Sequence, residues 1–544
     1  MKKILSVFLC AALLTGCGTG TVAEVTSSAV ETMPIATVAP TPVSSEVEYV
    51  SRFDYVTRIS LSDEGILVDS LDGGIKENES VFVTHDIIYY EDRDTYDSGN
   101  PYGEGSDADK HTADEAAAHT VVNITAPGAY RVSGKLSAGQ IRIDLGEDAY
   151  YDPEAVVELI LDGADITCTV APAILFQNTY ECDGLWSTDT AKAEVDTSAA
   201  GANLILKGSS TVNGAYVAKI FKDQEGEKKL WKQDGAIYSY MSMNVFGPGS
   251  LELNAANEGL DTELHLTING GSILINSDND GINTNEDGVS VTTINGGNLT
   301  ICACLGAEGD GIDSNGYLVI NGGTVISSAK PMADAGLDSD LGSFIHGGTV
   351  VALGSAMDWA ESNSGQITMN LQFAQQQGAG SRITVTREDG TEIFSFDDDS
   401  TNSRGFSGLI LSHSAFTQGE TYHIYVDGVQ MAYSGTDVRR SPGRMPPMDL
   451  DPENLPAGFD PDKHPERPGD FDPSQIRGKD QHSDADRILP PEGIDGNFPE
   501  GMEPPEIPED GFNSPQQDTM FTGKPNTAFY MNDKVNFFSG ISAA

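Results

Sequence analysis

The chain has 544 residues, of which 83 are Asp or Glu and 31 are Lys or Arg, so its formal net charge is −52. This charge excludes nucleic acid as a partner, because its binding depends on Lys and Arg placed against phosphates. It also argues against binding to an anionic membrane surface. Hydrophobic residues make up 38% of the chain, enough for a large core in part of it. Divalent cations are the natural counter-charge.

The N-terminus has the pattern of a bacterial lipoprotein signal. Lys2 and Lys3 precede an apolar run that ends in Leu14-Thr15-Gly16-Cys17. A basic start, a short apolar stretch and small residues before the cleavage point are typical of a secretory signal. We expect residues 1–17 to be this signal and Cys17 to be lipidated; the alternative is a plain signal peptide with an incidental cysteine. The predicted location is extracytoplasmic, anchored to the bacterial cell membrane through the lipid only.

The amino-acid composition changes along the rest of the chain and indicates separate segments. Ser, Thr, Ala, Val and Pro predominate just after the signal, as in a flexible linker. Near the far end, residues 440–520 hold 16 of the 26 prolines and few aliphatic residues, which predicts disorder. Short β-branched runs and turns elsewhere predict strands, and the acidic stretch 91–119 among them reads as a loop. The expected segments are a linker at 18–45, a β domain at 46–375, a C-terminal β cap at 376–439, a disordered segment at 440–524 and a returning strand at 525–544.

An internal repeat is the most informative feature. The motif Ile268-Asn269-Gly270-Gly271 recurs with its first residue at Ile294 and Ile320 and, with His346 in place of Asn, at Ile345, and an alternating strand follows each copy. A period of roughly 25 residues accommodates three short strands and three turns, and such units stack at about 4.8 Å. The repeat therefore predicts an all-β parallel solenoid.

Together with this repeat, two further stretches resemble a known family. Val122–Gly134 and Val157–Ile166 are similar to the clostridial-type carbohydrate-binding domain family. The resemblance covers roughly residues 55–375, with an echo in Val535–Ile541. It implies a right-handed parallel β-helix like that of pectate lyases, bound calcium, and affinity for cellulose and acidic sugars of the pectin type.

The asparagines of the repeat are expected to be structural. Stacking places Asn269, Asn295 and Asn321 in one column, which His346 ends. Asn tolerates a left-handed backbone beside Gly, and its amide can bond from coil to coil.

A second column of the repeat is acidic. Between residues 257 and 340 there are 13 Asp or Glu and a single Lys or Arg, Lys330. Stacked carboxylates repel one another, and calcium takes six to eight oxygen ligands of this kind. We therefore expect calcium as a cofactor; the alternative is that these residues form solvated turns. The candidate metal ligands are Asp261, Asp280, Asn283, Asp310, Asp313, Asp334 and Asp338.

Aromatic side chains are the usual platforms for sugar rings. Tyr238 and Tyr240 share one face of a predicted strand, and Trp359 lies in the aromatic-rich region that follows the repeat. We expect these three residues to bind carbohydrate; the alternative is that they pack in the core.

We expect binding of polysaccharide without catalysis. A pectate lyase uses Arg or Lys as its base, and no Arg occurs between Arg142 and Arg382. The predicted ligand is an acidic pectin-type or cellulosic plant glycan, bound with calcium as a bridge to sugar carboxylates, and the predicted state is a monomer. One alternative is a polysaccharide-degrading β-helix enzyme, pectate lyase or galacturonan hydrolase-like, with Asp310 and Asp313 as acid and base. Another is a purely structural surface protein.

Overall fold

The computed structural model describes residues 49–436 and 524–544, with gaps inside the first range at 71–72, 76, 91–107, 225–226, 304, 307–308, 332–333, 356–357 and 399–402. The predicted signal peptide with Cys17, the linker and nearly all of the segment 440–524 lie outside the described residues. Among the helices described, none is long and apolar enough to cross a membrane.

Helix is rare in the described part of the chain. The α-helix α1 (Ala113–Ala117) begins after Thr112, whose side chain and that of Glu115 cap each other's backbone N–H groups. A 3₁₀ helix covers Glu147–Tyr151. The stretch 91–119 was expected to be a loop, and at its C-terminal end this is wrong because the capping box stabilises a helical turn there.

The first strands form the N-terminal end of two sheets. Strands β1, β2 and β3 pair antiparallel, β1 also pairs in parallel with β6, and β4 pairs antiparallel with β5. Parallel pairing then takes over as β6 meets β8 and β5 meets β7. The bounds are β1 (Val56–Ser62), β2 (Gly65–Ser70), β3 (Gly73–Ile75), β4 (Val81–Thr84), β5 (Thr120–Ile124), β6 (Gly128–Leu136), β7 (Gly139–Asp144) and β8 (Val157–Thr167).

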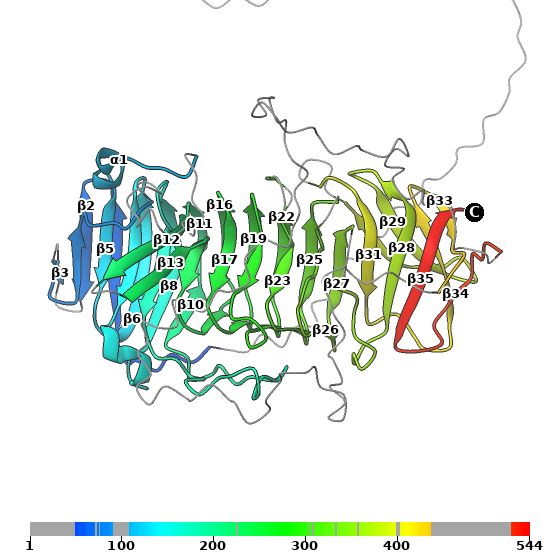
Figure 1. The fold of residues 1–544 in the computed structure, drawn as a ribbon, viewed down its shortest axis with the longest axis horizontal. Helices are drawn as coiled ribbons and strands as arrows, with labels where there is room; N and C mark the ends of the chain where they lie inside the picture. The colour runs from blue at the N-terminus through cyan, green and yellow to red at the C-terminus, as the bar shows by residue number, and fades with distance from the viewer. Residues whose placement is uncertain are drawn as a thin grey trace, which may run out of the picture. The chain divides into compact units, whose positions relative to one another are not determined.

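Through the repeat, successive units add strands to three parallel ladders, the third of which ends one unit before the other two, and Figure 1 shows strands of successive units side by side. The first ladder contains β10 (Ala202–Leu206), β15 (Met243–Phe246), β18 (Leu266–Ile268), β21 (Val291–Ile294), β24 (Tyr317–Ile320) and β26 (Gly342–Ile345). The second contains β11 (Ser209–Gly214), β16 (Ser250–Ala255), β19 (Ser272–Ser277), β22 (Asn298–Ala303), β25 (Thr324–Ala329) and β27 (Thr349–Gly354). The third continues from β7 through β9 (Ile174–Asn178), β14 (Gly235–Ser239), β17 (Glu258–Thr262), β20 (Ile282–Thr284) and β23 (Ile312–Ser314). A hairpin of β12 (Val217–Gln224) and β13 (Glu227–Gln233) is inserted before β14.

The double glycine of the repeat is a steric requirement. Gly297 has a φ of +88°, and a Cβ atom at this position would lie 2.7 Å from the carbonyl oxygen of Gly271 in the preceding unit. Only glycine allows both this backbone conformation and this close approach. Asn269, Asn295 and Asn321 do not share the positive φ. The left-handed backbone that Asn tolerates is therefore not adopted at these positions, because the second glycine of each pair makes the turn.

Antiparallel pairing returns after the repeat. Strands β28 and β31 pair antiparallel, and β35 lies parallel to β28. The large sheet, with 25 strands among the described residues, is thus mixed, and the described part of the chain is nearly all β. The bounds are β28 (Thr368–Gln377), β29 (Arg382–Arg387), β30 (Glu392–Asp397), β31 (Phe406–Ser412), β32 (Thr421–Val426), β33 (Val429–Ala432), β34 (Phe529–Tyr530) and β35 (Val535–Ala543).

The two largest apolar clusters of the described residues lie on either side of this change of pairing. Stacked aliphatic side chains, such as Ile268, Ile294 and Ile320, fill the interior between the three ladders. A second core rich in Phe, including Phe373, Phe406 and Phe538, lies among the C-terminal strands. Alternation along each strand sends every second side chain inward, so the residues between them form columns on the outer faces.

Candidate functional site

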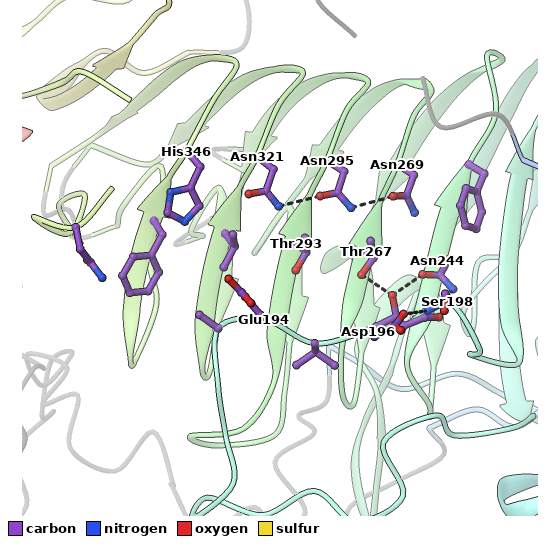
Figure 2. Close-up of a pocket in the computed structure, with 17 residues that line it drawn as sticks. Glu194, Asp196, Ser198, Asn244, Thr267, Asn269, Thr293, Asn295, Asn321 and His346 are labelled. Atoms are coloured by element: carbon purple, nitrogen blue, oxygen red, sulfur yellow. Dashed lines mark hydrogen bonds between the residues drawn. The ribbon is translucent and has the colours of Figure 1, made fainter. Parts of the chain in front are cut away.

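An asparagine ladder runs along the outer face of the first ladder of strands. The Nδ2 of Asn295 donates to the Oδ1 of Asn269, and the Nδ2 of Asn321 donates to the Oδ1 of Asn295, each at 2.9 Å (Figure 2). Each asparagine directly follows β18, β21 or β24, and His346 follows β26 at the equivalent position. The predicted coil-to-coil amide bonds are therefore present in the structure.

A second column lies beside this ladder. Parallel pairing aligns Asn244 of β15 with Thr267, Thr293, Val319 and Phe344 of the following strands. These side chains are two residues before the ladder position in each unit, so both columns project from the same face. Together the two columns form the floor of a groove.

A segment we call the strap, residues 193–198, forms the side of this groove. The Oγ1 of Thr197 lies 2.7 Å from both the Oδ1 of Asn244 and the Oγ1 of Thr267, and the Nδ2 of Asn244 donates to the carbonyl oxygen of Thr197 at 2.8 Å. Figure 2 shows Glu194 and Asp196 on the strap, with the strand residues between them and the Asn ladder. The groove has a volume of about 590 Å³.

The groove becomes more accessible along the ladder. Asn269 is 9% exposed, Asn295 is half-buried, and Asn321 and His346 are exposed. Within the ladder each amide bond uses one N–H and one oxygen lone pair, whereas an asparagine offers two of each. The Nδ1 of His346 accepts a hydrogen bond from the N–H of Gly365 at 3.0 Å, so the neutral ring carries its proton on Nε2. Donors and acceptors thus remain at the open end.

Aromatic rings lie at both ends of the groove. At the open end, Phe344 and His346 are nearly parallel, with ring centroids 6.2 Å apart and an angle of 16° between the planes. At the other end, Phe246 packs against Tyr49 with centroids 4.6 Å apart. The partly exposed Phe344 therefore offers an apolar surface beside the amides.

The strap gives the groove its charge. Glu194 and Asp196 are exposed, and hydrogen bonds from the hydroxyl and N–H of Ser198 lower the pKa of Asp196. The residues that line the groove include no Lys or Arg. Lys192 directly precedes the strap, and the Arg52 guanidinium donates to the carbonyl oxygen of Ser198 at 2.8 Å. The lining itself is thus neutral on the floor and anionic on the strap.

The three aromatic residues predicted to bind sugar are not in this groove. Tyr238, Tyr240 and Trp359 are 0%, 8% and 6% exposed. The rings of Tyr238 and Tyr240 pack edge to face, and the Tyr238 hydroxyl donates to Glu263. The prediction that these rings form a sugar platform is wrong because all three are buried: Trp359 packs in the main core, and the two tyrosines pack in a separate small cluster.

A buried acidic cluster, consisting of Asp234, Glu258 and Asp261, lies where β14 and β17 of the third ladder begin and pair. One carboxylate oxygen from each residue lies within 4.8 Å of the other two. Glu258 and Asp261 are 5% and 0% exposed, and their Oε2 and Oδ2 atoms have no hydrogen-bond partner. The Oδ1 of Asn283 in the next unit is also buried without a partner.

The polar neighbours of the acidic cluster offset part of its charge. The Nζ of Lys232 lies 3.1 Å from the Oδ2 of Asp234, and Asn285 donates to the Oδ1 of Asp261 at 2.6 Å. Burial, followed by the charge of Asp234, raises the pKa of Glu258 to about 7. Burial and the charge of Glu258 raise the pKa of Asp261 well above its usual value. One ammonium for three carboxylates leaves an excess that a proton or a bound cation would offset.

The other predicted metal ligands are arranged differently. The Oδ1 of Asp280 accepts from the N–H of Asp310 at 2.7 Å, and the Oδ1 of Asp310 accepts from the N–H of Ala335. The Oδ2 of Asp334 accepts from the N–H of Gly309 at 3.0 Å. Asp280, Asp310 and Asp334 therefore join neighbouring units through backbone amides. Asp313 and Asp338 are half-buried, and burial followed by the charge of Asp338 raises the pKa of Asp313.

Comparison with known proteins identifies the family of this chain. The model of the family described as "Carbohydrate-binding domain-containing protein" matches residues 118–415, more than half of the chain. The chain belongs to this carbohydrate-binding domain family. A relative of the same description from Acetivibrio thermocellus is 33% identical over 174 residues, which are 31% of this chain and 51% of the relative.

One solved structure is also similar to this member of the carbohydrate-binding domain family. It is a polysaccharide lyase-like protein from C. thermocellum, determined as a gadolinium derivative, with 20% sequence identity and a TM-score of 0.31. The match covers 54% of this chain and 92% of that one.

Sequence reasoning missed the strap and two of the three residues of the acidic cluster, Asp234 and Glu258. Glu258 occupies the first position of the repeated acidic motif, where Asp280 and Asp310 follow, so the repeat itself could have added it. Asp234 directly follows the β12–β13 hairpin and the strap precedes β10, both outside the periodic pattern. No spacing rule in the sequence connects either of them to the repeat.

Proposed function

We propose that this protein binds polysaccharide in the groove between the strap and the two outer columns, and that it does not cleave what it binds. The observation that carries this proposal is the Asn ladder, whose amides keep unused donors and acceptors where the groove opens at Asn321. Sugar hydroxyls both donate and accept hydrogen bonds, so they match such amides. Membership of the carbohydrate-binding domain family supports the proposal.

The scaffold of this binding site is proposed to be a right-handed parallel β-helix. Three parallel ladders that each gain one strand per repeat support a coil that stacks on itself. Connections between parallel strands of one sheet are right-handed in nearly all proteins. In such a coil, equivalent residues recur at the strand spacing of about 4.8 Å, which gives the groove a regular floor.

Calcium is proposed to bind in the acidic cluster. The unpartnered oxygens of Glu258, Asp261 and Asn283, together with Asp234, form a set of hard oxygen ligands, as calcium prefers. The cluster contains no Cys or His that would favour zinc. Because Glu258 and Asp261 are buried, this cation would stabilise neighbouring units and would not reach a sugar. This burial argues against the expected calcium bridge to sugar carboxylates.

The absence of turnover is proposed from the chemistry of the groove. Glu194 and Asp196 are both on the strap, and the opposite column offers asparagine amides and the ring of His346 but no carboxylate. Abstraction of a proton beside a sugar carboxylate requires a base such as Arg or Lys, and neither lines the groove. Asp310, the acid considered for a hydrolase, is 6% exposed and accepts from a backbone N–H of the next unit. These features favour binding over cleavage.

A cell-surface location completes the proposal. Lipidation at Cys17 would hold the protein on the outer side of the cell membrane, where polysaccharides are available. The variant Cys17→Ser should be released from membranes or mislocalised. A Cys17→Ser protein that still fractionates with membranes after a high-salt wash would contradict the lipid anchor.

Blocking the groove tests the binding function. Thr293 is in the middle of the groove floor, whereas Thr300 is an exposed residue of β22 on the second ladder. In a pull-down on a panel of polysaccharides, Thr293→Trp should lose at least tenfold in affinity and Thr300→Trp should match the wild type. Product assays should detect no new reducing ends and no unsaturated sugars. Wild-type protein that binds no polysaccharide would refute the function, and a fully active Thr293→Trp would refute the site.

A further inference from the structure

The charges of the groove are distributed unevenly between its two sides. The floor presents amides and hydroxyls from Asn295, Asn321 and Thr293, and the strap presents the carboxylates of Glu194 and Asp196. Asp196 is ionised at neutral pH, and the hydrogen bonds from Ser198 lower its pKa further below the ordinary value. A glycan in the groove therefore lies between neutral donors and acceptors on one side and negative charge on the other.

The hydrogen-bonding capacity of the floor distinguishes hydroxyls from carboxylates. After the ladder bonds are made, an asparagine such as Asn321 has both an N–H and an oxygen lone pair left. A sugar hydroxyl pairs with either, whereas a carboxylate only accepts and leaves the oxygen lone pair unpaired. At the open end, Phe344 adds an apolar surface that suits the C–H face of a sugar ring.

Hydrogen bonds attach the strap to the strands of the groove and to Arg52. Thr197 contacts Asn244 and Thr267, and Arg52 donates to the carbonyl oxygen of Ser198. These contacts fix the backbone that directly follows Asp196, so this end of the strap is held against the groove floor. Lys192 lies just before the strap and does not line the groove.

We infer that the strap is the specificity element of this site: Glu194 and Asp196 reject polyanionic glycans, and the floor retains uncharged, hydroxyl-rich ones. This inference rests on the proposed function and names the ligand class of the same groove. The Asn ladder presents one equivalent position per unit, so successive sugars of an extended chain meet the same amide chemistry. Asn321 and His346 form the most accessible of these positions.

Neutralising the strap tests this inference. Binding of neutral β-1,4-linked hexasaccharides with gluco, manno and xylo configuration, and of hexagalacturonate, is measured by calorimetry at low salt with calcium present. The double variant Glu194→Gln/Asp196→Asn should bind hexagalacturonate at least fivefold more tightly than the wild type does. The ratio of its affinity for hexagalacturonate to its affinity for the preferred neutral hexasaccharide should rise at least fivefold over that of the wild type. Added salt should reduce the difference between the two proteins, because screening weakens charge repulsion.

A second pair of variants connects this selectivity to the floor. A similar ladder on the second set of strands runs from Asn213 through Asn254 to Asn276, with amide bonds of 2.9 and 3.0 Å. Asn321→Leu and Asn276→Leu therefore each remove the end of one ladder, but only Asn321 lines the groove. Asn321→Leu should weaken neutral-glycan binding at least tenfold, and Asn276→Leu should leave it unchanged.

The outcomes separate the inference from the proposed function. If no hexasaccharide and no polysaccharide binds the wild type, the proposed function itself is wrong. If the wild type prefers hexagalacturonate, or if the strap variant does not gain affinity for it, glycan binding stands and the inference about the strap is overturned. Equal effects of Asn321→Leu and Asn276→Leu on glycan affinity would likewise show that the groove floor does not recognise the glycan.

Discussion

The groove floor and the acidic cluster are built by the same device with opposite chemistry. In both, neighbouring units place side chains close together, as with Asn295 beside Asn269 and Asp261 beside Asn283. Amides can pair with one another and still have capacity left, so the Asn column is stable while it opens to solvent. Carboxylates repel, so the buried acids depend on Lys232 and on a further positive charge. Stacking thus repeats the same type of side chain along a column, whether that side chain is an amide or a carboxylate.

Removing the ammonium of the acidic cluster should have the largest effect. Lys232→Met leaves three neighbouring carboxylates without their basic partner, and breaking a buried ion pair costs about 3 kcal/mol or more. In chelator, the free energy of unfolding by urea should fall by this amount. In calcium the loss should be smaller, because the more negative cluster binds the cation more tightly.

The control for this prediction is Lys192→Met, which removes an exposed lysine and should change stability by less than about 0.5 kcal/mol. Equal losses for Lys232→Met with and without calcium would show that calcium and the ammonium do not share a site.

Withdrawal of calcium from the wild type should have the next largest effect. A ligand at a hundredfold excess over its Kd stabilises the native state by about 2.7 kcal/mol, so EGTA should lower the melting temperature. Because the pKa of Glu258 is raised to about 7, protons compete with the cation below that pH. The stabilisation by calcium should therefore be largest above pH 7 and decline as the pH falls. A melting temperature insensitive to EGTA at pH 8 would contradict a bound cation.

Interrupting an Asn ladder should have a moderate effect. Asn295→Leu removes two amide bonds and leaves groups of Asn269 and Asn321 unpaired, at a cost of about 1–2 kcal/mol. Asn254→Leu interrupts the second ladder in the same way and serves as the matched control. Both variants should lose similar stability in urea unfolding, and only Asn295→Leu should lose glycan affinity. Loss of affinity in both would mean that stability, and not contact, controls binding.

The smallest effect is expected at a buried ring. Tyr240→Phe removes a hydroxyl that accepts from Gln233 at 3.3 Å, and it should cost less than about 1 kcal/mol with no change in glycan affinity. Phe344→Leu, which removes a ring from the groove, should weaken binding severalfold. Calorimetric titration distinguishes the two. A loss of affinity for Tyr240→Phe alone would restore the aromatic face that the sequence had suggested.

The sequence by itself determined everything that follows from its period. The spacing of Asn269, Asn295 and Asn321 predicted one column, and the amide bonds between them are present. The repeated glycines predicted the turns, of which Gly297 shows the steric reason. In a regular repeat, residues one period apart along the chain lie side by side in space, because each unit stacks on the previous one by parallel pairing.

Only the tertiary structure decided which residues meet outside that period. The strap forms hydrogen bonds with Asn244 and Thr267, which are far from it in the sequence. Asp234, at the end of a hairpin, lies beside Asp261. Burial was equally hidden, since the alternation that places Tyr238 on a strand face does not say which face is covered. Such contacts depend on how non-repeating segments pack against the stack, and the free energy of that packing has no signature in local spacing.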